Sequence, residues 1–399
     1  MRKHTLYLDH AATTPMSNAA IEAMRFGMEE CYGNPSSLHS VGQRANEALQ
    51  GARERMAELL GCRPDEIIFT SGGSEADNQA IRSAARLGEK KGKRHIVSTA
   101  FEHHAVLHTL RRLEQEGFSV TLLDVGTDGS VTPEQVGNAI QPDTCLVTVM
   151  YANNEIGTIQ PIGEIGAICQ EKGVLFHTDA VQAVGHIPIH VQREQIDLLS
   201  LSAHKFGGPK GVGALYARRG VALTSLIEGG AQERGKRAGT ENIPAILGMA
   251  AALEESCAHM EEHAQRTARL RDKLIAGIGQ IPHCALNGDP VRRLPGNVSF
   301  CFEGIEGESL LLLLDDKGIC ASSGSACTSG SLDPSHVLLA IGRPHEVAHG
   351  SLRLTLDGEL TDGEADYVIQ AVTETVAYLR GISPVWRDLE AGKKEFVIK

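Results

Sequence analysis

The stretch from Leu198 to Gly213, LLSLSAHKFGGPKGVG, predicts a buried β-strand that ends at a lysine and a glycine-rich turn. Leu198, Leu199 and Leu201 favour a strand, and Lys205 follows directly after it. Burying an ammonium group is costly unless the group is paired or deprotonated, so stability gives little reason for this placement. A chemical reason exists, because such an amine can act as a nucleophile and form a Schiff base. The alternative is an ordinary surface lysine beyond a strand, and this stretch alone leaves both open.

Composition argues against several classes of function. The 399 residues suffice for two or three domains, and 42% hydrophobic and 22% charged residues are typical of a globular protein. The formal net charge of −12 argues against nucleic acid as a ligand, because phosphate backbones bind to basic faces. The densest apolar run, Leu310 to Leu314, is far shorter than the roughly 18 to 20 residues that span a bilayer, so we expect no membrane contact.

The cysteines and the N-terminus bear on the compartment. Nine cysteines are scattered without a CxxC pair, which argues against a disulfide framework and a tetrahedral zinc site. The first residues, MRKHTLYLD, lack the apolar core of a signal peptide. We therefore expect a cytoplasmic protein.

Apolar strands alternate with helical segments through the first half of the chain. This pattern predicts an α/β fold with a mostly parallel sheet between helices, and ligands bind such sheets at the carboxyl ends of the strands. Beyond Pro244 the pattern changes to α+β. We therefore expect a large domain over residues 15–259 and a smaller one formed by residues 1–14 and 260–399. The predicted strands of the large domain are 66–70, 95–99, 118–125, 145–152, 174–180 and the run that begins at Leu198.

A strand followed by two glycines suggests a phosphate site. In Thr70-Ser-Gly-Gly-Ser-Glu75 the free amides of a helix N-terminus, together with glycine backbone, form a cradle for one phosphate. The spacing is neither GxGxxG nor a Walker A loop. The alternative is that Ser74 only caps the helix, with Asp77 completing a capping box.

Two further strand ends carry groups suited to a flat, charged ring. Asp179 stands at the tip of a buried strand, where it needs a cationic or donating partner. His103 follows the strand HIVST and could stack on a ring, while His104 and His108 raise a metal alternative that lacks a third ligand. With Lys205, these groups match what pyridoxal phosphate requires.

The chain resembles the cysteine desulfurases of the NifS/IscS kind, in the class-V aminotransferase group of fold-type I pyridoxal-phosphate enzymes. The resemblance runs nearly end to end and is carried by these stretches: YLDHAATTP, GNPSSLHSVG, IIFTSGGSEADN, NNEIG, HTDAVQAVG, LSAHKFGGPKGVG, QERGKRAGTEN and SSGSACTSGSLDPSHVL.

The last of these stretches is the most selective, because it holds Cys327 in a run of small polar residues. With little to bury, Ser322 to Leu332 is expected to be mobile, and a thiol there could enter a site and then meet a partner. An incidental exposed cysteine is the alternative. Cys320, at the base of the loop, is expected to pack.

The resemblance implies a full set of site residues. Lys205 would hold the cofactor and move protons, Cys327 would take the substrate sulfur as a persulfide, and His103 would stack on the ring as an acid–base group. Arg353 would clamp the substrate carboxylate with Asn34 and Asn154. The residues implied around pyridoxal 5'-phosphate are Gly73, Ser74, His103, Asn154, Asp179, Gln182, Ser202, His204, Lys205 and, from a neighbouring subunit, Thr240.

The resemblance also implies a homodimer that converts L-cysteine to L-alanine and passes sulfur to an acceptor. The acceptor that we expect is an iron–sulfur scaffold. Cys327 could then touch a cluster metal transiently through its persulfide on a docked scaffold. A selenocysteine lyase or related pyridoxal-phosphate enzyme is one alternative, and a metal-binding assembly protein without activity is another. The sequence does not identify the acceptor. It also does not distinguish a role dedicated to nitrogenase from a housekeeping role.

Two positions depart from the family pattern. His10 stands where tyrosine or asparagine is expected, and Asp357-Gly358 follows Arg353 where the family often has a polar residue such as arginine. These departures put substrate positioning in doubt, but not the reaction.

Overall fold

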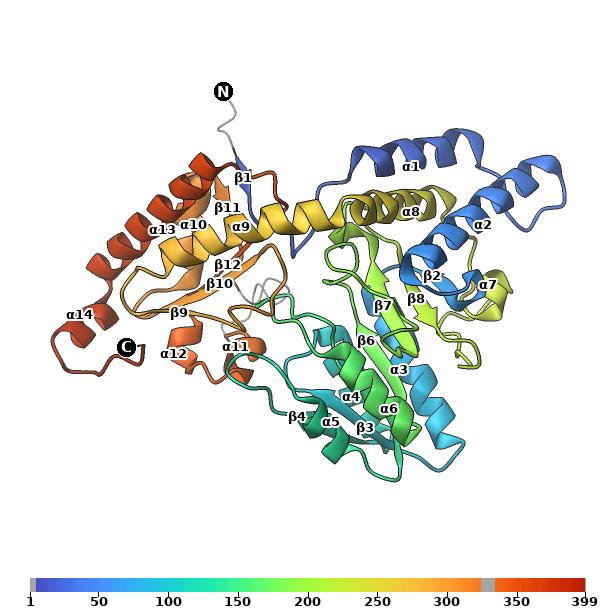
Figure 1. Cartoon of the computed structure of the whole chain (residues 1–399), viewed down its shortest axis with the longest axis horizontal. Helices are drawn as coiled ribbons and strands as arrows, with labels where there is room; N and C mark the ends of the chain where they lie inside the picture. Colours follow the sequence, from blue (N-terminus) through green and yellow to red (C-terminus); the bar gives the residue numbers. More distant parts are fainter. Residues whose placement is uncertain (1–4, 324–333, 399) are drawn as a thin grey trace.

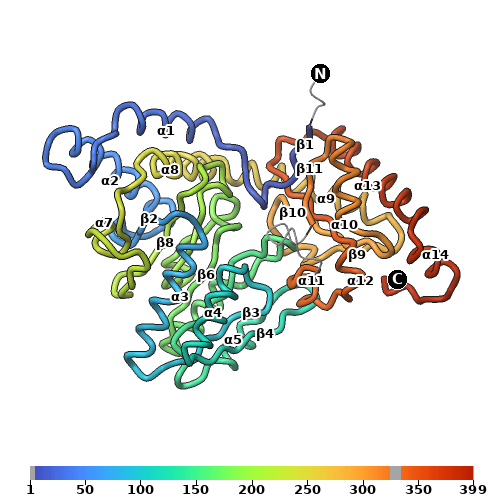
Figure 2. The backbone as a smooth tube through the Cα atoms, turned by 180° about the vertical axis from the view of Figure 1, so that it is seen from behind, coloured from blue at the N-terminus to red at the C-terminus, as the bar shows by residue number. Residues whose placement is uncertain are grey.

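The computed structural model describes residues 5–323 and 334–398, and Cys327 lies outside them. Figures 1 and 2 show two parts joined by the helices α8 (Ile243–Ala258) and α9 (Met260–Ile278), which follow each other across the molecule. The chain leaves the helical conformation between them at His259. No helix among the described residues is long and apolar enough to cross a membrane.

Within the described residues the first part holds a sheet of seven strands in the order β2-β8-β7-β6-β5-β3-β4. All neighbours are parallel except β8, which is antiparallel to both β2 and β7. The predicted α/β fold with a mostly parallel sheet is therefore confirmed. The strands are β2 (Ile67–Thr70), β3 (His95–Thr99), β4 (Ser119–Leu123), β5 (Thr144–Thr148), β6 (Leu175–Asp179), β7 (Leu198–Ser202) and β8 (Gly213–Ala217).

Sequence reasoning missed β8. Its five residues, GALYA, follow a glycine-rich turn that hides a short strand, because glycine is rare inside strands. β8 turns back beside β7 and separates it from β2. Since β2 and β7 are each antiparallel to β8, their carboxyl ends lie at the same edge of the sheet.

Helices cover both faces of this sheet. On one face, Ile68, Leu198 and Leu215 pack with α3 and α4; on the other, Phe69, Leu199 and other buried residues pack with α2, α6 and α8. Alternate residues of a strand point to opposite faces, so strands buried on both sides must be apolar throughout. The helices of this part are α1 (Asn18–Glu30), α2 (Ser40–Leu60), α3 (Gly73–Glu89), α4 (His104–Gln115), α5 (Pro133–Ala139), α6 (Ile162–Lys172) and the short α7 (Gln232–Gly235).

The second part has its own core, which includes the N-terminal strand. β1 (Leu6–Tyr7) pairs in parallel with β11 (Ile319–Cys320), and Leu6 and Leu8 pack with apolar residues between 270 and 379. The domain division at residues 14 and 260 stays a prediction. The remaining elements are the antiparallel strands β9 (Cys284–Leu286), β10 (Asn297–Phe302) and β12 (Ser351–Thr355), and the helices α10 (Gly307–Asp316), α11 (His336–Ala340), α12 (His345–Ala348), α13 (Asp362–Ile382) and α14 (Pro384–Glu390).

Candidate active site

Four of the predicted site residues follow strand ends at the carboxyl edge of the large sheet. β6 ends at Asp179, and β7 ends at Ser202, three residues before the short 3₁₀ turn closes at Lys205. α3 begins at Gly73 after β2, and His103 caps α4 after β3 through its Nδ1, which accepts from the Ala105 amide at 3.1 Å. The topology therefore brings together groups that are more than 100 residues apart in the chain.

Lys205 is held by the backbone of the N-terminal segment. Its Nζ donates to the carbonyl oxygens of Ala11 at 2.6 Å and Ala12 at 2.9 Å. The Lys205 carbonyl in turn accepts from His186 Nε2 at 2.8 Å. These contacts aim the amine at the sheet edge rather than at bulk solvent, which argues against an ordinary surface lysine.

Asp179 lies in an acidic pocket at the end of β6. It is 5% exposed, and its Oδ1 accepts from the Val181 amide at 2.9 Å. One ligand-type atom from each of Asp77, His103 and Asp179 lies within 4.8 Å of the others. Burial raises the pKa of the Asp179 carboxyl, whereas the nearby His103 and Lys205 lower it. Such a pocket suits a cationic nitrogen, and the resemblance implies that this nitrogen is that of the protonated pyridine ring.

Sequence reasoning gave Asp77 only a capping role. Its side chain is 1% exposed and lies next to those of Asp179 and His103. Its Oδ1 stands 3.6 Å from His177 Nε2 and has no hydrogen-bond partner within the described residues. Burial and the charge of Asp179 raise the pKa of the Asp77 carboxyl well above its usual range. The sequence signal was its place as the fifth residue of α3, within the first turns after the strand end.

The N-terminus of α3 has the features of an anion cradle. The cap residue is Gly72, with φ of +152°, so no cap side chain accepts from the first-turn amides. The alternative that Ser74 caps this helix is therefore wrong. A Cβ built on Gly72 would lie 3.6 Å from Ser202 Oγ, so the hydroxyl at the end of β7 faces this turn. Amides and a hydroxyl without a fixed positive charge suit one phosphate group.

His204 is oriented by the N-terminal segment, with its Nδ1 3.1 Å from Thr13 Oγ1. Burial, followed by the charges of Lys205 and Lys210, lowers the pKa of His204 to about 4. Its imidazole is therefore neutral at physiological pH and offers one donor and one acceptor.

Arg353 stands on β12 and is 2% exposed. Its Nη1 donates to the Asn154 carbonyl at 3.1 Å and its Nη2 to Asp9 Oδ1 at 2.8 Å, while Nε has no partner among the described residues. Arg353 and Asn154 are thus brought together as the prediction requires. A substrate carboxylate at this guanidinium would compete with Asp9.

Asn34, predicted to assist Arg353, does not meet it within one chain. Asn34 lies in the connection between α1 and α2, which Figures 1 and 2 place at the end of the molecule opposite to β12. Thr240 is exposed beyond α7, and its predicted role concerns the site of a neighbouring subunit. Gln182 stays beside the lysine, because its Nε2 donates to the same Ala11 carbonyl at 3.0 Å.

The segment that carries Thr240 is anchored by a buried ion pair. Arg53 on α2 binds both oxygens of Glu233, at 2.8 and 2.7 Å, and the Phe69 amide also donates to Glu233, at 3.1 Å. Further along, Arg237 pairs with Glu75 in the first turn of α3 at 3.0 Å. The motif QERGKRAGTEN thus fixes its own position against the phosphate turn.

The histidines beside His103 form a ring cluster. His104 lies 5.0 Å from His108 and 4.6 Å from His336 between ring centroids. His336 is thus a third imidazole, which sequence reasoning lacked. The metal-binding geometry found among the described residues is nevertheless that of Asp77, His103 and Asp179, not of this cluster.

Of the two cysteines near the predicted mobile loop, the structure describes Cys320 but not Cys327. Cys327, the predicted persulfide residue and transient metal contact, falls in 324–333 and so lies outside the described residues. Cys320 is half-buried in β11, and burial followed by the charge of Asp315 raises the pKa of its thiol. A raised pKa leaves less thiolate at neutral pH, which agrees with a packing role for Cys320.

Comparison with known proteins identifies the family. The model of the class-V aminotransferases matches residues 6–368. The cysteine desulfurase IscS of Clostridium botulinum is 53% identical over 393 residues, which cover 98% of this chain and 99% of that protein. The corresponding protein of Methanosarcina thermophila is 54% identical over 380 residues, covering 95% and 94%. A solved structure of a NifS-like protein superposes with a TM-score of 0.88 at 39% identity, covering 94% of this chain and 100% of that one.

The chain belongs to the class-V aminotransferase family, whose enzymes use pyridoxal 5'-phosphate. Within that family, the relatives that match it over nearly its whole length are cysteine desulfurases. The resemblance drawn from the sequence motifs is thereby confirmed.

Proposed function

We propose that the carboxyl edge of the large sheet converts L-cysteine to L-alanine and that Cys327 receives the sulfur as a persulfide. The enzyme is a pyridoxal-phosphate-dependent cysteine desulfurase, as its full-length relatives indicate. One observation in the structure carries the assignment of residues. The amine of Lys205, the acidic pocket of Asp179 and the uncapped N-terminus of α3 surround one edge of the sheet.

Each end of the cofactor has a matching partner in this arrangement. Gly73 and Ser74 offer first-turn amides to the phosphate, with Ser202, His204 and, from a second subunit, Thr240 completing its surroundings. Asp179 would bind the pyridine nitrogen. The ring would lie under His103, within reach of Asn154 and Gln182. When bound, pyridoxal phosphate supplies an electron-withdrawing ring that makes protons at the substrate α-carbon acidic.

The remaining steps belong to side chains of this chain. Arg353 would hold the substrate carboxylate, assisted by Asn154 and by Asn34 of a second subunit, since Asn34 is remote within one chain. Lys205 would remove and return protons at the α-carbon, and His103 would donate or accept a proton beside it.

Sulfur transfer itself needs no outside oxidant. The Cys327 thiolate attacks the substrate sulfur, an S–S bond forms, and the C–S bond breaks with its electron pair left on the carbon, which is then protonated. The products are L-alanine and a Cys327 persulfide, so atoms and electrons balance.

We further propose a cytoplasmic homodimer that supplies an iron–sulfur scaffold, with Cys327 contacting cluster metal only through its persulfide. The dimer is supported by an apolar surface around α1. Ile21, Phe26 and Met28 are each about half exposed there, and Tyr32 and Leu38 in the following connection are more exposed still. Large exposed apolar patches mark interaction surfaces. This surface includes the connection that carries Asn34.

Cys327→Ala tests the sulfur step, with Cys320→Ala as the matched cysteine control. We expect Cys327→Ala to retain the visible absorption of the bound cofactor, and its change on addition of L-cysteine, while sulfide release falls at least about 10³-fold. Cys320→Ala should release sulfide at nearly the wild-type rate. Wild-type release by Cys327→Ala would exclude its role.

The same assay with L-selenocysteine separates a desulfurase from a selenocysteine lyase, which would act faster on the selenium substrate. The alternative of an inactive metal-binding assembly protein is disfavoured by the family assignment.

A further inference from the structure

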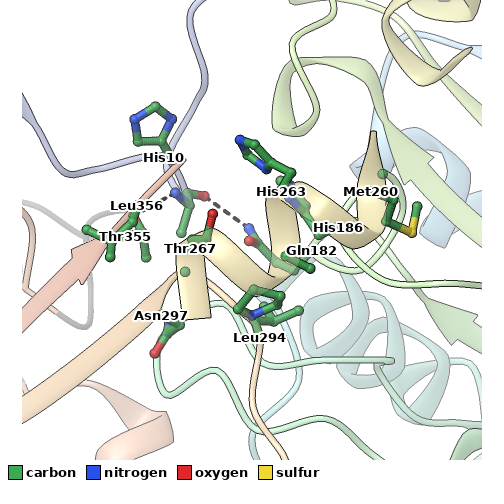
Figure 3. A pocket seen from close by; sticks show the side chains of 15 residues that line it. His10, Gln182, His186, Met260, His263, Thr267, Leu294, Asn297, Thr355 and Leu356 are labelled. Atoms are coloured by element: carbon green, nitrogen blue, oxygen red, sulfur yellow. Dashed lines mark hydrogen bonds between the residues drawn. The ribbon is translucent and has the colours of Figure 1, made fainter. Parts of the chain in front are cut away.

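A small cavity lies beside the active site, where α9 passes between the two parts of the molecule (Figure 3). Its volume is about 50 Å³, and its lining residues are 10–11, 182, 185–186, 260, 263–264, 267, 294–297 and 355–356. One water needs roughly 10 to 15 Å³ by this measure, so there is room for a few waters or one small polyatomic ion. Five segments distant in the sequence meet here, and the predicted function uses only Gln182 among the residues lining the cavity.

Two buried side chains of this cavity have unsatisfied polar atoms. His10 is 7% exposed and Thr267 is 3% exposed, yet His10 Nδ1 and Thr267 Oγ1 have no hydrogen-bond partner within the described residues. Leaving a buried polar atom unpaired costs about 1 to 3 kcal/mol, so two such atoms facing one cavity call for a ligand.

The chemistry of His10 defines what it can bind. Its Nε2 lies 3.1 Å from the Tyr7 carbonyl, which can only accept, so Nε2 carries the hydrogen. Burial lowers the pKa of His10, with Asp357 acting in the opposite direction. The ring is therefore neutral, and Nδ1 presents a lone pair. His186 is similar: its Nε2 donates to the Lys205 carbonyl, and burial lowers its pKa.

Both departures from the family pattern meet at this cavity. Asp357 Oδ2 lies 3.5 Å from His10 Nε2, although the two residues are 347 positions apart. A Cβ on Gly358 would lie only 2.6 Å from Thr267 Oγ1 and 3.2 Å from His263 Nε2. Glycine at 358, where φ is +86°, therefore leaves these two atoms room to face a ligand.

We propose that this cavity binds a small cation that donates hydrogen bonds, such as ammonium or the ammonium head of a primary amine. Its unpaired atoms include the Nδ1 acceptor of His10 and a hydroxyl that can accept. Asp357 does not line the cavity, but its carboxylate lies 3.5 Å from His10 Nε2, so an acidic group stands on the far side of the His10 ring. His263, on α9, is exposed at the rim. A transition metal fits less well, because these atoms do not form a metal-binding group among the described residues.

A cation bound in the cavity would affect the protonation of Lys205. The Ala11 carbonyl accepts from Lys205 Nζ on one side and from Gln182 Nε2 on the other, and both Ala11 and Gln182 line the cavity. A cation held there disfavours a second positive charge on Lys205 and so favours the neutral amine. The cavity would thus adjust the reactivity of Lys205 without touching substrate.

The test is the thermal unfolding midpoint of the cofactor-loaded enzyme, titrated with ammonium or methylammonium chloride. Potassium and tetramethylammonium chlorides at equal ionic strength serve as comparison salts, since neither donates a hydrogen bond. We expect a saturable rise with the two donors only. This readout does not depend on desulfurase activity, so it can fail while the proposed function stands.

Thr267→Val removes the hydroxyl at nearly constant volume, and we expect it to raise the ammonium concentration at half-saturation about tenfold or more. Thr375→Val is the matched control, because Thr375 is another buried helical threonine, bonded to the Ala371 carbonyl at 2.7 Å. It should bind as the wild type does. His10→Phe provides a second removal of an acceptor, should Thr267→Val fail to fold.

The proposal is overturned if the four salts act alike, or if Thr267→Val and His10→Phe both respond as the wild type does. A stoichiometric transition metal that co-purifies with the enzyme and is lost in His10→Phe would overturn it in favour of a metal site.

Discussion

The sheet edge and the cavity beside α9 bury titratable groups in opposite ways. At the sheet edge, burial raises the pKa of the carboxyls of Asp77, Asp179 and Glu102. At the cavity, burial lowers the pKa of the imidazoles of His10 and His186. One region therefore favours neutral acids and loses stability as the pH rises, whereas the other favours neutral bases and loses stability as the pH falls.

The two regions also differ in how their residues reach them. Those of the sheet edge follow strand ends, so one topological rule assembles them. Those of the cavity come from five segments that meet only through tertiary packing. The difference teaches that a site built by strand order is visible in a sequence, and that a cavity built by packing is not.

The largest expected effect separates the two regions. Lys205→Ala removes the amine that would hold the cofactor and move the substrate proton, so desulfurase activity should fall at least about 10³-fold and the visible absorption of the bound cofactor should be lost. Absorption spectra and sulfide release measure both.

The ammonium response of the unfolding midpoint should persist in Lys205→Ala, because the variant leaves His10 and Thr267 in place. If that response disappears together with the visible absorption of the cofactor, the sheet edge and the cavity form one site and are not two separate regions.

An intermediate effect tests the acidic side of the comparison. Glu102 is fully buried, and burial raises its pKa to about 8. Its Oε1 accepts from Thr99 Oγ1 at 2.7 Å and from the Met150 amide at 2.9 Å, while Oε2 lacks a partner among the described residues. A carboxyl with a raised pKa contributes stability that is complete below its ordinary pKa and is lost as the pH rises through 8.

Glu102→Gln cannot ionise, so it should escape this loss. Between pH 6 and pH 9 the wild type should lose on the order of 2 kcal/mol of unfolding free energy that the variant keeps. Urea unfolding at the two pH values measures the difference. Parallel curves for the two proteins would mean that Glu102 is already ionised in the fold.

The sequence predicted which groups meet at the sheet edge, because strand ends carry recognisable chemistry. Lys205, Asp179 and the glycine turn at Gly72 stand where a strand stops, and parallel order then brings them together. β8 was missed because a five-residue strand after glycines has no periodic signal. In the sequence, Asp77 resembled a capping residue. The sequence does not show that Gly72 is the N-cap of α3, or that the Asp77 and Asp179 side chains lie close together.

The cavity could not be predicted at all. His10 and Asp357-Gly358 were visible as departures from the family pattern, but the contacts of His10 with Asp357 and of Gly358 with Thr267 on α9 depend on tertiary packing. Nothing in the spacing of His10 and Asp357, which are 347 positions apart, indicates that their side chains lie 3.5 Å from each other.

The smallest expected effect tests the link between the two regions. Thr355 lines the cavity, and its Oγ1 accepts from the Ala11 amide at 2.9 Å, on the segment whose carbonyl holds Lys205. Thr355→Val leaves that buried amide unpaired and should cost about 1 to 2 kcal/mol of unfolding free energy. It should also shift the pH midpoint of the cofactor's visible absorption, because Ala11 is then free to move away from the lysine. Thr375→Val loses a comparable hydroxyl on α13 and should leave that midpoint unchanged. Equal midpoints in the two variants would show that Ala11 does not couple the cavity to the lysine, leaving the cavity a neighbour of the active site without influence on it.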